Sequence, residues 1–198
     1  MNELFSAVFK FILTLVLIPV IYAATILFGK HYAQFSGVQE DFFYWGIWFF
    51  VVVYIFVYQF KGVQDAGRKI VSGIFGFVSF GKNFFANIFP FYFFIIMLGF
   101  HVARNVFNVK NYNHFFLFFG GFSIAMHVIE TAGELQSQEK GLVKPNYYFS
   151  ICLVYLFSVF FIILMMNLLT SIFTFPKYIN GIIKISNDIF IMFWKGFI

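Results

Sequence analysis

Long apolar runs constrain the fold of this chain more than any other feature. A helix needs roughly 20 mostly apolar residues to cross a bilayer. Four runs meet that length: about 11–29, 42–60, 114–131 and 147–175. Of the 198 residues, 62% are hydrophobic, 36 are Phe and only 11% are charged, whereas soluble domains have about 25% charged residues. The sequence therefore predicts an all-α, polytopic helical membrane protein in contact with the lipid bilayer.

A fifth run, 84–102, is long enough to cross but has Pro90 in its middle. The segment 70–81 before it contains three glycines, and it is too short to cross and too apolar for an ordinary loop. Residues 70–102 together suit a Pro/Gly-interrupted, re-entrant hairpin, because non-helical backbone is tolerated at membrane depth where protein surrounds it. We favour this hairpin, which gives four spans. A single crossing by 84–102, which gives five, is the alternative.

Orientation is predicted from Lys and Arg in short loops, which favour the cytoplasmic side. With the hairpin, the basic segments around Lys69, Lys110 and Lys184 share one side with both termini. The loops 30–41 and 132–146, which carry acidic residues, then lie on the other side. The sequence thus predicts an inner, or cytoplasmic, membrane protein with both termini cytoplasmic.

The two ends of the chain differ in character. The first run is longer than the apolar core of a signal peptide and has no small-residue cleavage site, so we interpret it as an uncleaved first span. In the tail, about 178–198, apolar residues recur at helical spacing and Trp194 and Lys195 end the pattern, which is typical of an interfacial helix. We find no repeat or linker and predict one integral membrane domain over 1–198.

Several functions have no support. The net charge of +5 is spread along the chain, which argues against nucleic acid as a partner. Cys152 is the only cysteine, so an intramolecular disulfide is impossible. We predict no cofactor.

A candidate metal site consists of His127, Glu130 and Glu134, which stack on one side of a helix because they are three and four residues apart. Glu-x-x-His pairs bind metal in helical bundles, but those bundles need a matching second helix, and no other run here carries a deep acidic residue. We therefore favour a packed, partly wet helix end in which His127 is hydrogen-bonded.

Other polar residues within the apolar runs or at their ends could line a path or pack helices together. These residues are Asn87, His101, Arg104 and Asn167. Outside the runs, we expect Arg68 and Lys69 to contact lipid phosphates.

Three pieces of the chain resemble the site-2 (M50) metalloproteases. Residues 45–63 resemble the span that in the family ends in His-Glu-x-x-His, and residues 76–94 resemble a strand-like stretch leading into the next helix. Residues 122–159 resemble a late helix and the span after it. The resemblance covers roughly 44–160 and implies a related membrane fold.

The zinc motif of that family is absent. The motif would place its two histidines at Tyr58 and Gly62 and its glutamate at Gln59. Gly62 has no side chain to bind a metal, and an amide cannot act as a general base. The resemblance therefore implies a relative without zinc and without peptidase activity.

Three functions remain as hypotheses. The first is a non-catalytic subunit or accessory factor of a membrane assembly, or a degenerate M50-like protein, with other membrane subunits or copies of itself as partners. The second is a small oligomeric transporter or channel, because an interrupted hairpin at membrane depth is a common substrate site. The third is a membrane enzyme with a site at His127, Glu130 and Glu134.

Overall fold

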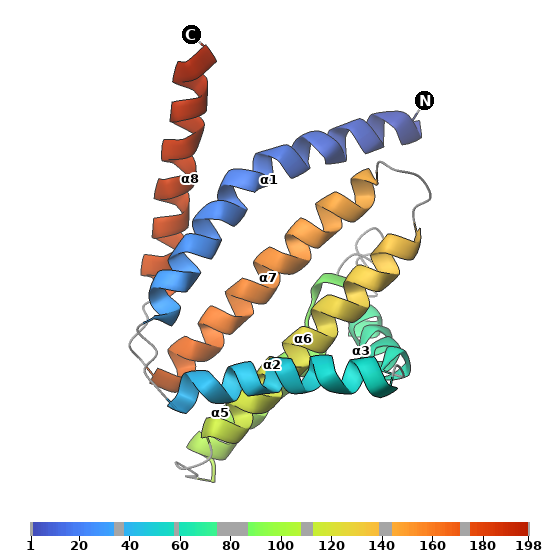
Figure 1. Ribbon diagram of the computed structural model, residues 1–198, viewed down its shortest axis with the longest axis vertical. Coiled ribbons are helices and arrows are strands. Elements are labelled where there is room, and N and C mark those ends of the chain that lie inside the picture. The colour runs from blue at the N-terminus through green and yellow to red at the C-terminus, as the bar shows by residue number, and fades with distance from the viewer. Residues whose placement is uncertain are drawn as a thin grey trace. The chain divides into compact units, whose positions relative to one another are not determined.

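The computed structural model describes residues 2–33, 38–57, 60–74, 87–107, 113–138, 144–170 and 175–197. These residues confirm the all-α prediction (Figure 1). Their helices are α1 (Asn2–Tyr32), α2 (Val38–Val57), α3 (Lys61–Ile74), α5 (Phe91–Asn105), α6 (Asn113–Gln138), α7 (Pro145–Thr170) and α8 (Phe175–Phe197).

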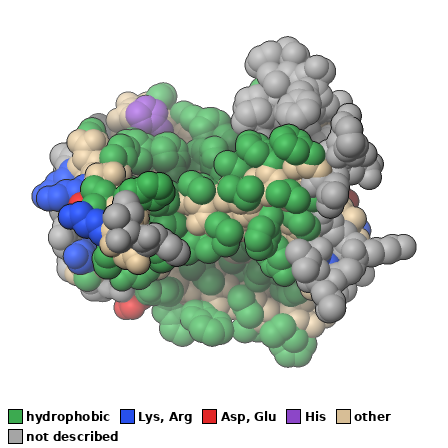
Figure 2. All heavy atoms as spheres, turned by 90° about the horizontal axis from the view of Figure 1, so that it is seen from above, with side chains coloured by type: hydrophobic (Ala, Val, Ile, Leu, Met, Phe, Trp, Pro, Cys, Tyr) green, Lys and Arg blue, Asp and Glu red, His purple; other side chains and the backbone are tan. Residues whose placement is uncertain are grey.

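Three helical segments are long and apolar enough to cross a membrane. They are Phe5–Tyr32, Asn113–Gln138 and Pro145–Leu168. A fourth span is obtained if α2 and α3, between which the chain bends by 119°, count as one broken crossing. Hydrophobic side chains also cover most of the described surface in Figure 2. The chain is therefore a multi-pass helical membrane protein, as its apolar runs predict.

The contacts group the chain into two compact units. The first comprises Met1–Gln34 and Leu135–Ile198, and the second comprises Phe35–Glu134. The boundary falls inside α6, so one continuous helix contributes to both units. The single domain remains a prediction.

In the first unit, α1 and α7 run parallel (Figure 1). Lys10 near the start of α1 hydrogen-bonds Asn146 at the start of α7, and further along the Thr25 and Tyr155 hydroxyls lie 2.6 Å apart. The amphipathic helix α8 returns along α1 in the opposite direction. Its Tyr178 hydroxyl donates to the Ala24 carbonyl oxygen at 2.9 Å.

In the second unit, α2 and α6 touch backbone to backbone. A Cβ atom on Gly46 would overlap the Phe118 carbonyl oxygen, and one on Gly121 would overlap the Phe43 carbonyl oxygen. Next to this crossing, Phe50 of α2 packs edge-on against Phe122 of α6. Small residues at a crossing let membrane helices approach closely, and aromatic rings then fill the space beside them.

Two segments predicted as loops are helical, and these predictions were wrong. The basic segment that begins at Lys61 forms α3 as far as Ile74, and residues 132–138 extend α6 beyond the predicted end at 131. Pro90 precedes α5 rather than interrupting it, because proline cannot donate to the helical ladder. The turn of the predicted hairpin lies within 75–86, outside the described residues.

Candidate functional site

The candidate site lies where α3 packs on α6, and α3 meets α6 with its polar side. Gln64, Gly67 and Val71 are buried, while the large apolar residues Val63 and Ile70 are exposed. A helix in water buries its apolar stripe. In α3 the exposed surface carries Val63 and Ile70 together with Lys61 and Lys69. Such a mixed surface suits a helix at the lipid headgroups, while Gln64 and Arg68 find partners inside the protein.

His127 of α6 is held between two hydrogen-bond partners. Its Nδ1 atom lies 3.0 Å from the Gln64 side-chain nitrogen, and its Nε2 atom lies 3.2 Å from the Ile88 carbonyl oxygen. Because the amide nitrogen of Gln64 can only donate, Nδ1 accepts and Nε2 carries the proton that is donated to Ile88. The imidazole is therefore a neutral ring whose two nitrogens are both used, as expected of a hydrogen-bonded His127.

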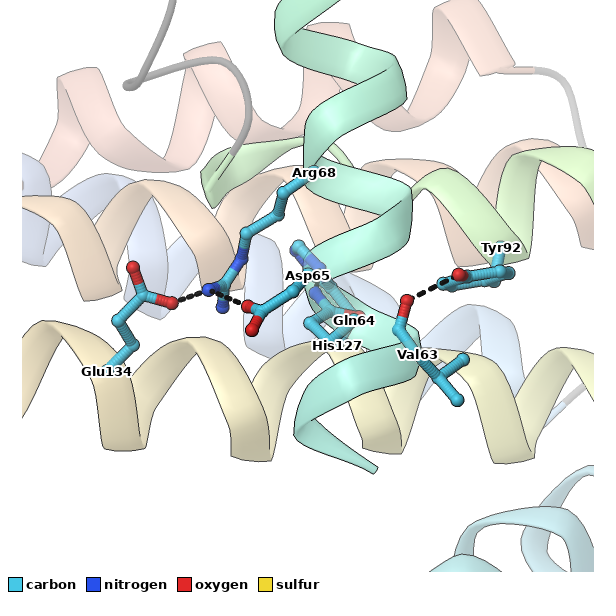
Figure 3. Close-up of polar contacts among 7 residues, drawn as sticks. All are labelled: Val63, Gln64, Asp65, Arg68, Tyr92, His127 and Glu134. Atoms are coloured by element: carbon cyan, nitrogen blue, oxygen red, sulfur yellow. Dashed lines mark hydrogen bonds and ion pairs between the residues drawn. The ribbon is translucent and has the colours of Figure 1, made fainter. Parts of the chain in front are cut away.

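Arg68, one turn after Gln64, pairs with acidic residues of both helices. Its guanidinium contacts the Glu134 carboxylate of α6 and lies 3.5 Å from the Asp65 carboxylate of α3. The Arg68 side chain is only 12% exposed and that of Glu134 is 30% exposed. The expected contact of Arg68 with lipid phosphates is thus wrong, because this charge is directed inward at a carboxylate (Figure 3).

The helix α5 packs against the same part of α3. The Tyr92 hydroxyl donates to the Val63 carbonyl oxygen, and the Tyr92 ring lies where a side chain on Gly67 would otherwise be. Figure 3 shows Tyr92 beside the first turns of α3 and the Arg68–Glu134 pair further along the helix. Polar contacts thus join α3 to α5 and α6.

The predicted metal candidates do not converge. His127 binds Gln64 and Ile88, Glu134 binds Arg68, and Glu130 is half-buried on the helix between them. Within the described ranges, no group of three His, Cys, Asp or Glu side chains is placed to hold a metal ion. A metal at His127 would have to break one of its hydrogen bonds.

The predicted polar-path residues belong to both units. His101 and Arg104 are exposed near the end of α5, where Asn105 hydrogen-bonds His101. Asn87 is half-buried in the second unit, and Asn167 is half-buried in α7 of the first unit. Of the positions corresponding to the peptidase motif, Tyr58 and Gln59 lie outside the described residues, and Gly62 is exposed in α3.

Gln64, Arg68 and Tyr92 were missed as site residues by sequence reasoning. A signal for α3 was present, because Val63, Ile70 and Ile74 recur at helical spacing. Gln64 and Arg68 lie four residues apart and so share one face of such a helix. Their partners on α6 lie more than 60 residues away in the chain, which local spacing cannot reveal.

Comparisons with known proteins do not assign the chain to a family. No family model, curated protein or solved structure matches the chain.

Proposed function

We propose that this chain is a non-catalytic integral membrane protein that acts by binding, as a subunit or accessory factor of a membrane assembly. The observation that supports this role is the use of its buried polar groups in packing. Both nitrogens of His127 are hydrogen-bonded, and Arg68 is paired with Glu134 and Asp65. A catalytic or transport site would instead direct such groups towards a substrate or a water-filled path.

The resemblance to M50 proteins fits the same role. A relative that lacks the zinc ligands would keep a membrane scaffold and lose the peptidase chemistry. Gly62, at the position of the second histidine, is exposed, and no described residue beyond its own helical turn comes within 4 Å of where a Cβ would lie. We therefore propose binding without proteolysis.

We also propose that the chain crosses the membrane five times. Successive crossings alternate in direction, so a helix parallel to α1 must be the third or fifth crossing. In the four-span hairpin arrangement α7 would be the fourth crossing and would oppose α1. The contacts of Lys10 with Asn146 and of Thr25 with Tyr155 support the parallel direction.

Two measurements on the tagged, full-length protein test the binding role. After mild detergent extraction from its host membrane, we expect one membrane protein to co-purify at fixed stoichiometry, or a defined homo-oligomer to form. The purified chain alone in proteoliposomes should show no solute or ion flux. A lone monomer that conducts, and whose flux is lost in His127→Gln, would replace the proposal with a transporter.

A further inference from the structure

A cavity in the first unit has walls from α1, α7 and α8. Its volume is about 430 Å³, within the range of roughly 300–1,000 Å³ that is typical of ligand sites. The lining includes Val20 and Ala24 of α1, Leu156 and Phe160 of α7, and Ile179 and Ile182 of α8. Tyr178 also lines it, but the hydroxyl of this residue is used by the Ala24 carbonyl oxygen. Hydrocarbon surface therefore dominates the cavity, and none of the described residues that line it is charged.

The size of the cavity favours a single hydrocarbon chain over a helix from a partner. One turn of α-helix is about 5.4 Å long and about 10 Å across, so a single turn would take up about 420 Å³. An unbranched acyl chain is narrower and can follow the space between helices. Two of the three walls, α1 and α7, are membrane-span candidates, so such chains surround them.

Two lysines flank in sequence the contact between α1 and α8 at the Tyr178 end of this cavity. The Tyr178 ring meets the His31 ring edge-on at a centroid distance of 5.5 Å, which brings the end of α1 and the start of α8 together. Their sequence neighbours Lys30 and Lys177 are both exposed. Two cations beside an apolar cavity complement a phosphate joined to a hydrocarbon chain.

We propose that this cavity binds one acyl chain of an anionic phospholipid from the surrounding bilayer, with the phosphate near Lys30 and Lys177. The site is separate from the polar contacts of α3 and goes beyond the binding role proposed above. The bound lipid fills the space between α8 and the two spans.

Filling the cavity with an indole tests the acyl-chain site. The full chain is reconstituted in phosphatidylcholine vesicles containing phosphatidylglycerol and re-extracted, and the phospholipid retained per protein is measured by native mass spectrometry. We expect about one retained lipid, and a loss of roughly tenfold or more in Val20→Trp and Ile182→Trp. Each methylene of the acyl chain that is buried in the cavity raises the affinity for the lipid about fourfold. The indole ring displaces several of these methylenes.

The matched controls are Ile18→Trp and Ile183→Trp, which add the same ring at exposed positions of the same two helices. Both should retain lipid. Circular dichroism shows whether each variant is folded. Because Val20 and Ile182 lie on different helices, the second variant still tests the site if the first one misfolds. The proposed site would be contradicted if the unchanged protein retained no lipid. It would also be contradicted if Val20→Trp and Ile182→Trp retained as much lipid as the two controls.

Removing the two lysines tests the headgroup. The double variant Lys30→Ala/Lys177→Ala should still retain phospholipid but lose its preference for phosphatidylglycerol over phosphatidylcholine. The control is Lys184→Ala, an exposed lysine of α8 away from that end, which should keep the preference. An unchanged preference in the double variant would contradict the assignment of the phosphate to these lysines.

Discussion

Among single residues, the inward-facing Arg68 shows how strongly lipid changes the role of a charged side chain. In water, an arginine on a short helix would face the solvent. Here the neighbouring apolar residue Ile70 is exposed, and the arginine side chain is 12% exposed beside the carboxylate of Glu134. A buried charge without a partner is costly. The ion pair therefore favours the position in which α3 packs Arg68 against Glu134 of α6.

We expect Arg68→Ala and Glu134→Ala each to lower the free energy of unfolding by about 1.5–3 kcal/mol, the range for hydrogen bonds to charged groups. Thermal unfolding in detergent measures the effect. The swapped pair Arg68→Glu/Glu134→Arg should recover part of the loss. Lys69→Ala, at the exposed neighbouring position, is the control and should change stability by less than about 0.5 kcal/mol. Equal effects of Arg68→Ala and Lys69→Ala would contradict an inward-facing ion pair.

Tyr178 of α8 provides a second prediction for a single residue. Burial raises the pKa of its hydroxyl well above the ordinary value of 10.0, and Tyr155 adds to the effect. The unfolded chain therefore loses this proton at a lower pH than the folded protein does, so stability should fall as the pH rises above about 10.

Tyr178→Phe removes both the ionisation and the hydrogen bond to Ala24. We expect it to cost about 0.5–1.5 kcal/mol at neutral pH and to flatten the alkaline decline in thermal unfolding. Tyr22→Phe, an exposed tyrosine of α1, should leave the decline intact. If both variants decline alike above pH 10, Tyr178 is not the group that titrates.

Among the helices, the contact of α2 with α6 depends on the absence of side chains at two positions. Gly46→Ala or Gly121→Ala places a methyl group against the carbonyl oxygen of the facing helix. A backbone cannot move aside as a side chain can, so the helices must separate and the packing of Phe50 on Phe122 is lost.

We expect each substitution to destabilise the protein by at least about 1–3 kcal/mol, the usual cost of overpacking, as measured by thermal unfolding in detergent. Gly133→Ala on α6 is the control, because its Cβ would have no atom within 4 Å. It should be neutral or slightly stabilising, since alanine favours a helix over glycine. Stability of Gly121→Ala equal to that of Gly133→Ala would show that the crossing is not tight.

For the whole molecule, the parallel course of α1 and α7 favours an odd number of crossings from α1 to α7, as in the five-span arrangement that we propose. Five crossings put the loop near Lys110 on the side opposite the N-terminus and the loop before α7 on the same side as the N-terminus. The four-span hairpin reverses both placements.

Cysteine labelling separates the two arrangements. In a Cys152→Ser background, Lys110→Cys should react with an impermeant thiol reagent applied to intact cells, provided that the N-terminus is cytoplasmic. Lys144→Cys should react only after the membrane is opened. A cysteine between the end of α1 and the start of α2 is the control and should be labelled from outside in either arrangement. Labelling of Lys144→Cys but not of Lys110→Cys would restore the hairpin.

The sequence by itself determined the class of this protein and most of its helices. Run length and composition act locally, since each apolar stretch must satisfy its own backbone hydrogen bonds in lipid. The runs near α1, α2, α6 and α7 could therefore be read directly from the sequence. The last turns of α6 were predicted in two ways, because Glu134 shares a helical face with His127 and Glu130 but also lies in the polar segment 132–146, which was assigned to a loop.

Only the tertiary structure decided which polar groups meet. His127 and Glu134 stood out in the sequence as possible ligands, yet Gln64 and Arg68 of α3 are their partners. Gln64 and Arg68 come from the segment that begins at Lys61, which we predicted to be a loop because it is basic. The parallel course of α1 and α7 likewise depends on contacts between distant residues, such as Thr25 and Tyr155. Local periodicity sets which face of a helix is polar, but long-range packing decides what that face touches.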